Sequence, residues 1–427
     1  MKKILLFTTL STALSTFAQI QVIDTENDIE ISSLSDNGEI ATFSSPSKMY
    51  IWTKETGVQE LSNYAPTVGR SGTVILNADG TKISSTVMNP STGNNEMGLY
   101  DISTKTWKYL GGLKHYMGNE ESSAYSISND GKTVVGLGWF EKNSAHAISW
   151  NETTGIKDLG SSVVGNSSRA NDVNSNGDII VGWQDNSEWY RQGAIWKDGK
   201  QTLFFGKEGE YAGEAIAVSS NGKWIVGGYL NYDAWIWSEE TGIFPVGYPN
   251  AGMDLKGVST GVSNDGQIVV GFFQAMTAEY SSNGFIWTPQ TGAIPLTEYL
   301  KTGGIDVSGY YLYGPEGITD NGKFVFGRGL KDGKRINFIV ELPELLATNE
   351  IAKNEINIYP NPVKDQINIS TKDKIAKTEI YSLTGQLIKS TKLENNKLDV
   401  QNLKSGTYIL KIIFENQKEI TQKFIKK

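Results

Sequence analysis

The sequence predicts an all-β protein: a seven-bladed β-propeller followed by a small Ig-like β-sandwich. Three observations support this. An Asn-Gly or Asp-Gly pair recurs at intervals of 42 to 56 residues, a period typical of propeller blades. Each of the first six copies predicts four short strands, and the composition changes near residue 350. The seven glycines of the recurring pairs are Gly38, Gly80, Gly131, Gly177, Gly222, Gly266 and Gly322.

The segment AYSISNDGKTVVG, residues 124–136, represents the first half of a unit. A first strand of small and aliphatic residues leads into the Asp-Gly pair. Asn, Asp and Gly adopt positive φ at low energetic cost, so the pair predicts a two-residue hairpin turn. The nearly all-apolar run Val134–Gly136 then reads as a strand buried on both faces.

In four units the third strand has Ala or Gly three residues before a Trp, as in Ala147 and Trp150. In three of these units a Thr-Gly turn and a short fourth strand follow. A single four-stranded sheet cannot hide its apolar faces, but a ring of such sheets can. We therefore expect the Trp to be a wedge between neighbouring blades.

The seventh unit lacks a Thr-Gly turn and a fourth strand, and it has Val340 at the Trp position. Closing the ring requires a strand from elsewhere. The segment Ile20 to Asp24 resembles a fourth strand, so we expect the N-terminus to pair with the seventh blade.

The chain ends predict export and a two-part organisation. Lys2 and Lys3 precede an apolar run and a small-residue stretch ending at Ala18, the layout of a secretory signal peptide. From Glu350 onward the chain has 14 Lys or Arg against 9 Asp or Glu, and the part before has 25 against 38. We expect a signal peptide (1–18), the propeller (19–346), a linker (347–354) and the C-terminal domain (355–427).

One copy of the repeat, HAISWNETTGIKDLG at residues 146–160, resembles the extracellular HAF repeat. That repeat is named for a His-Ala-Phe triplet before a Trp and a closing Asp-Leu-Gly. The other copies keep only the small residue and the Trp. The resemblance implies a secreted repeat protein of propeller type, without catalytic residues to carry over.

The C-terminal segment resembles the type A sorting domain of the type IX secretion system of Bacteroidota. Turns at Thr384-Gly385 and Ser405-Gly406 between alternating apolar runs predict the sandwich itself. The resemblance implies recognition by the outer-membrane translocon, then release or attachment at the cell surface. The residues that match the family's signal are Tyr359, Pro360, Asn361, Pro362, Gly385, Gly406 and Tyr408.

Composition limits the chemistry. The absence of Cys excludes disulfides and thiolate metal sites, and two His residues exclude multi-histidine sites. We expect no cofactor and no metal. The acidic propeller argues against nucleic acid as a partner, and no later stretch is apolar enough to span a membrane. GVSTG at 257–261 matches a nucleophile-elbow pattern but lies in a strand, so chance explains it.

Parity of the strands predicts a binding face. In a four-stranded blade the two tight turns lie on one face of the ring, and the variable connections lie on the other. Scaffolds of this kind commonly place function on such variable loops. These connections are rich in aromatics and acids, and the candidate ligand-binding residues are His115, Tyr116, Glu120, Glu121, Trp139, Trp183, Trp189, Tyr190, Tyr211, Tyr232 and Asp233.

Three classes of function fit this face. A non-enzymatic module that binds a glycan or protein outside the cell is the leading expectation, because aromatics stack on sugar rings or anchor protein contacts. The alternatives are a polysaccharide-cleaving glycosidase or lyase, using two carboxylates or His115 with Tyr116, and a structural adhesin or scaffold. Enzymatic activity is left open, leaning towards none.

Overall fold

The computed structural model describes residues 19–25, 28–62, 72–141, 144–206, 208–230, 233–247, 255–275, 283–343, 356–360, 362–371, 374–382, 387–393, 396–415 and 419–427. They form two compact units, 1–343 and 344–427. The predicted signal peptide and linker lie outside the described residues. No helix within the described ranges is long and apolar enough to cross a membrane.

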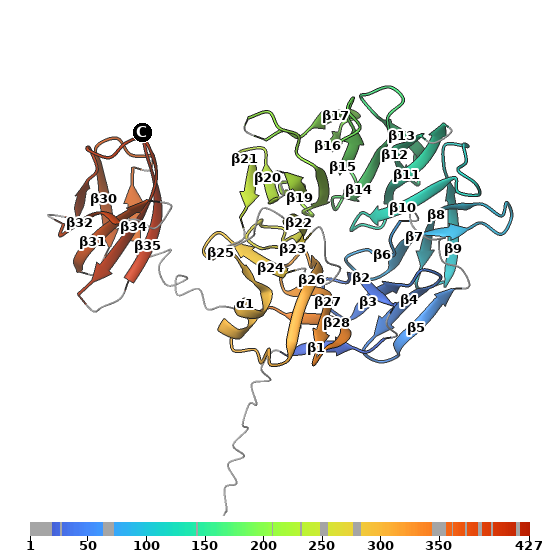
Figure 1. Cartoon of the computed structure of the whole chain (residues 1–427), viewed down its shortest axis with the longest axis horizontal. Helices are drawn as coiled ribbons and strands as arrows, with labels where there is room; N and C mark the ends of the chain where they lie inside the picture. Colours follow the sequence, from blue (N-terminus) through green and yellow to red (C-terminus); the bar gives the residue numbers. More distant parts are fainter. Residues whose placement is uncertain are drawn as a thin grey trace, which may run out of the picture. The chain divides into compact units, whose positions relative to one another are not determined.

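The first unit is a ring of seven antiparallel blades of four strands each, which confirms the predicted fold class (Figure 1). Blades 5 and 6 are joined into one eight-stranded sheet by the pairing of Gly228 with Val258. From the inner to the outer strand, blade 1 contains β2 (Glu30–Leu34), β3 (Ile40–Ser44), β4 (Met49–Thr53) and β5 (Gly57–Ser62); blade 2, β6 (Ile75–Leu76), β7 (Lys82–Met88), β8 (Asn95–Asp101) and β9 (Thr106–Gly111); blade 3, β10 (Ser122–Ile127), β11 (Thr133–Glu141), β12 (Ser144–Asn151) and β13 (Gly155–Gly160).

The remaining blades follow the same order. Blade 4 contains β14 (Ser168–Val173), β15 (Ile179–Asp185), β16 (Arg191–Lys197) and β17 (Lys200–Leu203); blade 5, β18 (Glu214–Val218), β19 (Ile225–Leu230), β20 (Asp233–Ser238) and β21 (Gly242–Val246); blade 6, β22 (Leu255–Val262), β23 (Val269–Ala275), β24 (Asn283–Thr288) and β25 (Gly292–Pro295); blade 7, β26 (Tyr310–Ile318), β27 (Phe324–Lys331) and β28 (Lys334–Glu341).

The N-terminus closes the ring, as predicted. Strand β1 (Ile20–Ile23) pairs antiparallel with β28 and supplies the fourth strand of blade 7, with Ile20 opposite Val340. Ile20 and Val340 are both buried. This strand joins the two ends of the propeller in one sheet (Figure 1).

The repeated Trp is an inter-blade wedge, also as predicted. Trp150 of blade 3 is buried with Met97 and Leu99 of blade 2, and Trp52 of blade 1 is buried with Phe326 and Ile339 of blade 7. Each large ring therefore fills the space next to the preceding blade, where it removes apolar surface from water.

In the second blade, a pair of aromatic residues replaces this Trp. Tyr100 occupies the Trp position, and its pairing partner in the fourth strand is Trp107. The two ring centroids lie 5.0 Å apart. In blades 3 and 5 the corresponding partners of the Trp are the smaller Ile156 and Ile243. A Trp in the fourth strand thus accompanies the smaller Tyr in the third.

The first turn of each unit is not the two-residue hairpin that we predicted. In blade 1, Gly38 N–H donates to Ser35 O (2.8 Å), and Ser35 N–H donates to Ile40 O (2.9 Å), so four residues separate the closing pair. Gly38 has φ 72°, but Asn37 is not left-handed, whereas a type I′ turn needs positive φ at both positions. The Ser35 hydroxyl accepts from Ile40 N–H and donates to Asn37 Oδ1, which stabilises the longer turn.

The link between blades 6 and 7 contains a short helix that the all-strand reading did not predict, α1 (Leu296–Thr302). Its buried residues Leu296, Tyr299 and Leu300 recur at helical spacing. Pro295 precedes the first turn, and Gly303 follows the last.

The second unit is a sandwich of two antiparallel sheets, ordered β29-β30-β33 and β32-β31-β34-β35. Its core contains Ile367, Ile369, Leu410, Ile412 and Phe424, each nearly or fully buried. The strands are β29 (Ile356–Tyr359), β30 (Gln366–Thr371), β31 (Ile375–Ser382), β32 (Leu387–Thr391), β33 (Lys397–Asp399), β34 (Gly406–Phe414) and β35 (Glu419–Lys426).

Candidate binding site on the loop face

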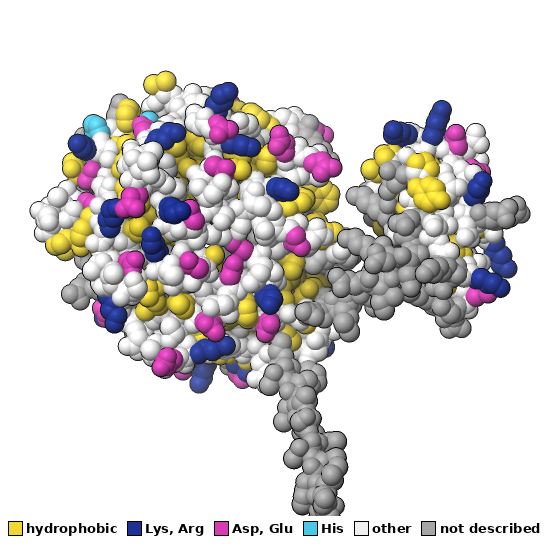
Figure 2. All heavy atoms as spheres, turned by 180° about the vertical axis from the view of Figure 1, so that it is seen from behind, with side chains coloured by type: hydrophobic (Ala, Val, Ile, Leu, Met, Phe, Trp, Pro, Cys, Tyr) yellow, Lys and Arg dark blue, Asp and Glu magenta, His cyan; other side chains and the backbone are white. Residues whose placement is uncertain are grey.

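Strand order divides the propeller into two faces. We call the face that carries the second-to-third-strand connections and the links between blades the loop face, and the opposite one the turn face. On the surface shown in Figure 2, acidic and basic side chains are interspersed over the propeller. The channel and the loop face are the two places where side chains from several elements converge.

A bulge in the inner strand shapes the central channel. In blade 3, Ala124 pairs with Gly136 and Ser126 with Val135, which leaves Tyr125 as an extra residue in the wall. A side chain on Gly136 would place its Cβ 1.9 Å from Ser123 O, so the two strands of blade 3 lie too close for a side chain there. The same shift occurs opposite a glycine in blades 4, 5, 6 and 7, and opposite Phe43 in blade 1.

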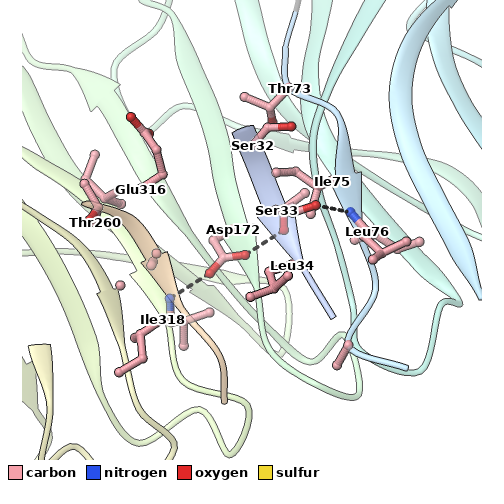
Figure 3. Close-up of a pocket in the computed structure, with 18 of the residues that line it drawn as sticks. Ser32, Ser33, Leu34, Thr73, Ile75, Leu76, Asp172, Thr260, Glu316 and Ile318 are labelled. Carbon is pink, nitrogen blue, oxygen red and sulfur yellow. Dashed lines mark hydrogen bonds between the residues drawn. The ribbon is translucent and has the colours of Figure 1, made fainter. Parts of the chain in front are cut away.

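The channel is a cavity of about 420 Å³ bordered by the inner strands of all seven blades (Figure 3). Neighbouring inner strands are joined across its wall by side chains. Ser32 Oγ donates to Val74 O (2.7 Å), and Thr260 Oγ1 donates to Pro315 O (2.9 Å). The polar groups of the wall therefore hold one blade to the next.

A carboxylate in the channel also joins neighbouring blades. Asp172 accepts from Ser126 Oγ (2.6 Å) and Val218 N–H (2.8 Å), which links blades 3, 4 and 5. Burial raises the pKa of Asp172 to about 6. Because its oxygens accept hydrogen bonds from the protein, Asp172 is a poor candidate for one of a pair of catalytic carboxylates.

At the turn-face mouth, a further carboxylate pair closes the ring between blades 7 and 1. Burial, and then the nearby Asp320, raise the pKa of Asp36 to about 6. Asp36 Oδ1 accepts from Asp320 N–H (2.9 Å). The Asp320 carboxylate in turn accepts from Asn129 and Ser220. Four blades thus meet at these two acids.

On the loop face, the described aromatics are most exposed on blade 4. Trp189 and Tyr190 lie in the connection between β15 and β16, with 69% and 63% of their surface exposed. Trp189 has φ 65°, a left-handed conformation that costs an L-residue about 1–2 kcal/mol. This ring therefore points into solvent from a strained backbone.

A single side chain fixes that connection. Asn186 Oδ1 accepts from Glu188 N–H (2.9 Å) and Tyr190 N–H (3.0 Å). Asn186 N–H donates to Tyr190 O (2.9 Å), and Trp189 N–H donates to Asn186 O (3.0 Å). The two rings are consequently presented by a preformed loop.

The link from blade 4 to blade 5 adds two more exposed rings. Phe205 and Tyr211 are 50% and 41% exposed, and their centroids lie 6.1 Å apart. Gln192, next to the first loop, donates to Phe204 O (3.3 Å) and so ties the link to it. We call Trp189, Tyr190, Phe205 and Tyr211 the blade 4 platform.

Sequence reasoning found three members of this platform and missed Phe205. The signal was the doublet Phe204-Phe205. Successive residues of an extended segment point to opposite sides, so one ring of such a pair must leave the core. In the structure Phe204 is buried and Phe205 is exposed.

Trp183 lies below the surface, not in the platform. It is 6% exposed, and the guanidinium groups of Arg191 and Arg169 lie 4.4 Å and 5.2 Å from its ring. Both arginines pair with the buried Glu214. Trp183 therefore supports β15 and β16, and it offers no open ring face for stacking.

The residues predicted around His115 do not form one cluster. Glu120 and Glu121 are buried: Glu120 Oε1 accepts from Trp139 Nε1 (3.2 Å) and Glu121 Oε1 from Gly112 N–H (3.1 Å). Trp139 is only 4% exposed. These three stabilise the link from blade 2 to blade 3.

His115 and Tyr116 are exposed in the same link, on the loop face and apart from the blade 4 platform in the chain. The ring of His115 lies 6.1 Å from that of Phe140. Asp233 is half-buried at the start of β20, and burial raises its pKa. Tyr232 lies outside the described residues.

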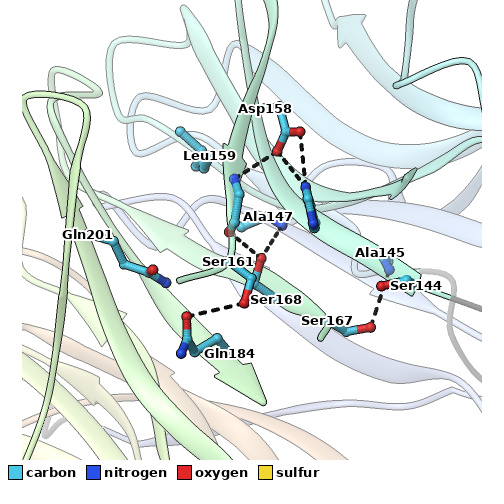
Figure 4. Close-up of polar contacts among 12 residues, drawn as sticks. Ser144, Ala145, Ala147, Asp158, Leu159, Ser161, Ser167, Ser168, Gln184 and Gln201 are labelled. Atoms are coloured by element: carbon cyan, nitrogen blue, oxygen red, sulfur yellow. Dashed lines mark hydrogen bonds and ion pairs between the residues drawn. The ribbon is translucent and has the colours of Figure 1, made fainter. Parts of the chain in front are cut away.

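The single His of the HAF-like copy has a structural role. Both carboxylate oxygens of Asp158, which Figure 4 labels, lie 3.0 Å from His146 Nδ1. The ring of His146 stacks on that of Phe140, with the centroids 4.2 Å apart. Burial acts to raise the pKa of Asp158, but hydrogen bonds from His146 and Gly160 outweigh it and lower the pKa below its usual range. The pair joins the third and fourth strands of blade 3.

No group of three or more His, Asp or Glu side chains in the described part of the chain is arranged to hold a metal ion.

In the second unit, Tyr359 is 53% exposed, and Asn368 Nδ2 donates to its carbonyl (3.1 Å). Tyr408 packs on the core, and its hydroxyl donates to Lys404 O (2.8 Å), just before Gly406. Pro360 and Pro362 are exposed, whereas Asn361 and Gly385 lie outside the described residues.

Residues 357–427 match the family model of the secretion system C-terminal sorting domain. This supports the predicted sorting domain and indicates secretion or outer-surface attachment through the type IX system. The chain is also 30% identical to Beta-agarase D of Zobellia galactanivorans over 86 residues. That match covers 20% of this chain and 18% of the agarase.

Three solved structures resemble the chain at low identity. The β-propeller domain of the Trilobed protease from Pyrococcus furiosus has 14% identity, with 76% of this chain and 95% of that chain covered at a TM-score of 0.45. TolB from Acinetobacter baumannii has 15% identity, with 74% and 64% covered at 0.39. An oligogalacturonate lyase in complex with manganese has 15% identity, with 78% and 95% covered at 0.46. With TM-scores this low, the blade count rests on the strand pairing of this chain.

Proposed function

We propose that this chain, which its sorting domain directs to secretion or the outer cell surface, is a non-enzymatic binding module whose blade 4 platform binds a glycan. The observation that carries the proposal is the strained, exposed Trp189. A large apolar ring 69% exposed contributes little burial energy, and its positive φ is unfavourable. Strain of this kind persists where the residue serves a function.

The surroundings of the platform suit sugar chemistry. Aromatic rings stack on the apolar faces of sugars, and the side chain of Arg191, half exposed beside Tyr190, offers N–H donors to hydroxyl groups. Because Asn186 holds the loop in place, little order has to be gained on binding, which favours affinity.

The predicted alternative of a polysaccharide-cleaving enzyme has less support. Glu120 and Glu121 face inward and accept hydrogen bonds from the protein, and Asp172 does the same in the channel. A scaffold role would not explain why Trp189 is kept in a strained, exposed conformation.

The test compares Trp189→Gly with the unmodified protein, produced from Gln19 to Lys427, on a polysaccharide panel. We would measure depletion of the protein from solution and the release of new sugar ends. Glycine relieves the strain at this position, so the variant should fold at least as stably while its binding falls at least tenfold. Phe244→Ala is the matched control, because Phe244 is 50% exposed on the outer strand of blade 5.

Binding that survives in Trp189→Gly would overturn the platform as the site. Release of sugar ends by the unmodified protein would overturn the non-enzymatic assignment. If no polysaccharide depletes the protein, the glycan proposal is wrong, and a protein ligand becomes the hypothesis to pursue.

A further inference from the structure

The blade 4 platform carries a particular charge pattern. Glu188 is exposed in the Asn186–Tyr190 loop, one residue before Trp189. Glu208 is exposed and Glu210 is partly buried between Phe205 and Tyr211. Three carboxylates therefore lie within three residues of a platform ring.

The cations of this region are mostly neutralised. Glu214, 5% exposed, pairs with both Arg169 and Arg191 beneath the platform. Asp185, at the end of β15, adds a further negative charge that interacts with Arg191. By sequence, 185–191 and 204–214 contain five acidic residues against two basic ones, Arg191 and Lys207.

This pattern constrains the ligand. A sugar carboxylate or sulfate stacked on the rings would lie near Glu188, Glu208 and Glu210, within the distance over which charges interact in physiological salt. A neutral sugar would meet no such repulsion. Its hydroxyl groups can donate to the same carboxylates and accept from Arg191.

We infer that the platform selects uncharged polysaccharides and rejects polyanionic ones through the acidic rim formed by Glu188, Glu208 and Glu210. This inference rests on the proposed glycan-binding function and adds the ligand class. It follows from side chains on two loops that come together only in the folded blade.

The experiment uses pairs of polysaccharides that share a backbone and differ in charge: hydroxyethyl and carboxymethyl cellulose, desulfated and native κ-carrageenan, methyl-esterified and de-esterified polygalacturonate. Binding of the protein from Gln19 to Lys427 is measured at low and high salt. For each backbone that is bound, the neutral member should bind about tenfold tighter at low salt, and the difference should shrink at high salt.

Charge reversal tests the rim directly. The double variant Glu188→Lys/Glu208→Lys should bind the anionic member at least tenfold better than the unmodified protein does, with Trp189 still required. Glu55→Lys/Glu240→Lys is the matched control, because both acids are exposed in turns on the turn face and the change in net charge is the same. The control should leave the preference unchanged.

The outcomes separate the two proposals. If binding depends on Trp189 but the anionic member binds equally or better, the rim inference is wrong and the binding module stands. A control that changes the preference as much as the rim variant would also refute the rim. If no member binds, both proposals fall.

Discussion

Replacing Gly136 by alanine is expected to destabilise the propeller strongly. The new Cβ would lie 1.9 Å from Ser123 O, 3.0 Å from Ser123 C and 3.2 Å from Ala124 Cα. Contact with a backbone carbonyl cannot be relieved by a side-chain rotation, so β10 or β11 must move. Overpacking of this kind costs about 3 kcal/mol, or roughly 4 °C in Tm for a unit of this size.

The assay is thermal unfolding followed by Trp fluorescence and circular dichroism, with Gly247→Ala as the control. A Cβ on Gly247 meets nothing within 4 Å, and its φ is not in the left-handed region. Both variants lose the same backbone freedom in the unfolded chain, so their difference isolates the clash. A Tm for Gly136→Ala within ~1 °C of the control would refute the argument that the close approach of β10 and β11 requires glycine at this position.

Three further predictions concern the ring and the platform. In urea unfolding, the free energy of unfolding of Asp36→Asn should increase relative to that of the unmodified protein as pH rises from 4.5 to 7.5. The pKa of Asp36 in the folded protein is about 6, against an ordinary value of 3.8. The stability that the protonated carboxyl contributes to the unmodified protein is therefore lost as pH rises through 6. A difference in free energy of unfolding that does not change with pH would refute this prediction. Deletion of Ile20–Ile23 should lower Tm and produce oligomers in size-exclusion chromatography, because it exposes the edge of β28; a monomer of unchanged Tm would refute the closure. Asn186→Ala should weaken glycan binding several-fold with about 1 kcal/mol lost in stability, because two N–H groups lose their acceptor; unchanged binding would show that the loop needs no such support.

Much of the fold could be predicted because it depends on local and periodic signals. The Asn-Gly and Asp-Gly pairs mark turns, and the spacing of small residue and Trp marks the third strand. The absence of a fourth strand in the last unit leaves one place for Ile20–Ile23, and the structure confirms that pairing.

The turn type was predicted wrongly because the deciding contact is made by a side chain five residues away. The Ser35 hydroxyl accepts from Ile40 N–H and lengthens the turn. Dipeptide identity alone does not reveal this. The helix α1 was missed for a related reason: its apolar spacing covers only seven residues, too few to stand out from a strand in sequence.

The sequence by itself determined the repeat, its count, the closing strand and the sorting domain, because each depends on residue types at fixed spacing. The tertiary structure decided which aromatics are exposed. Trp183 and Trp189 are six residues apart and equally hydrophobic, yet one is buried beside two guanidinium groups and the other is exposed to solvent. Burial depends on what the neighbouring strands and blades place over a ring, and those neighbours come from distant parts of the chain.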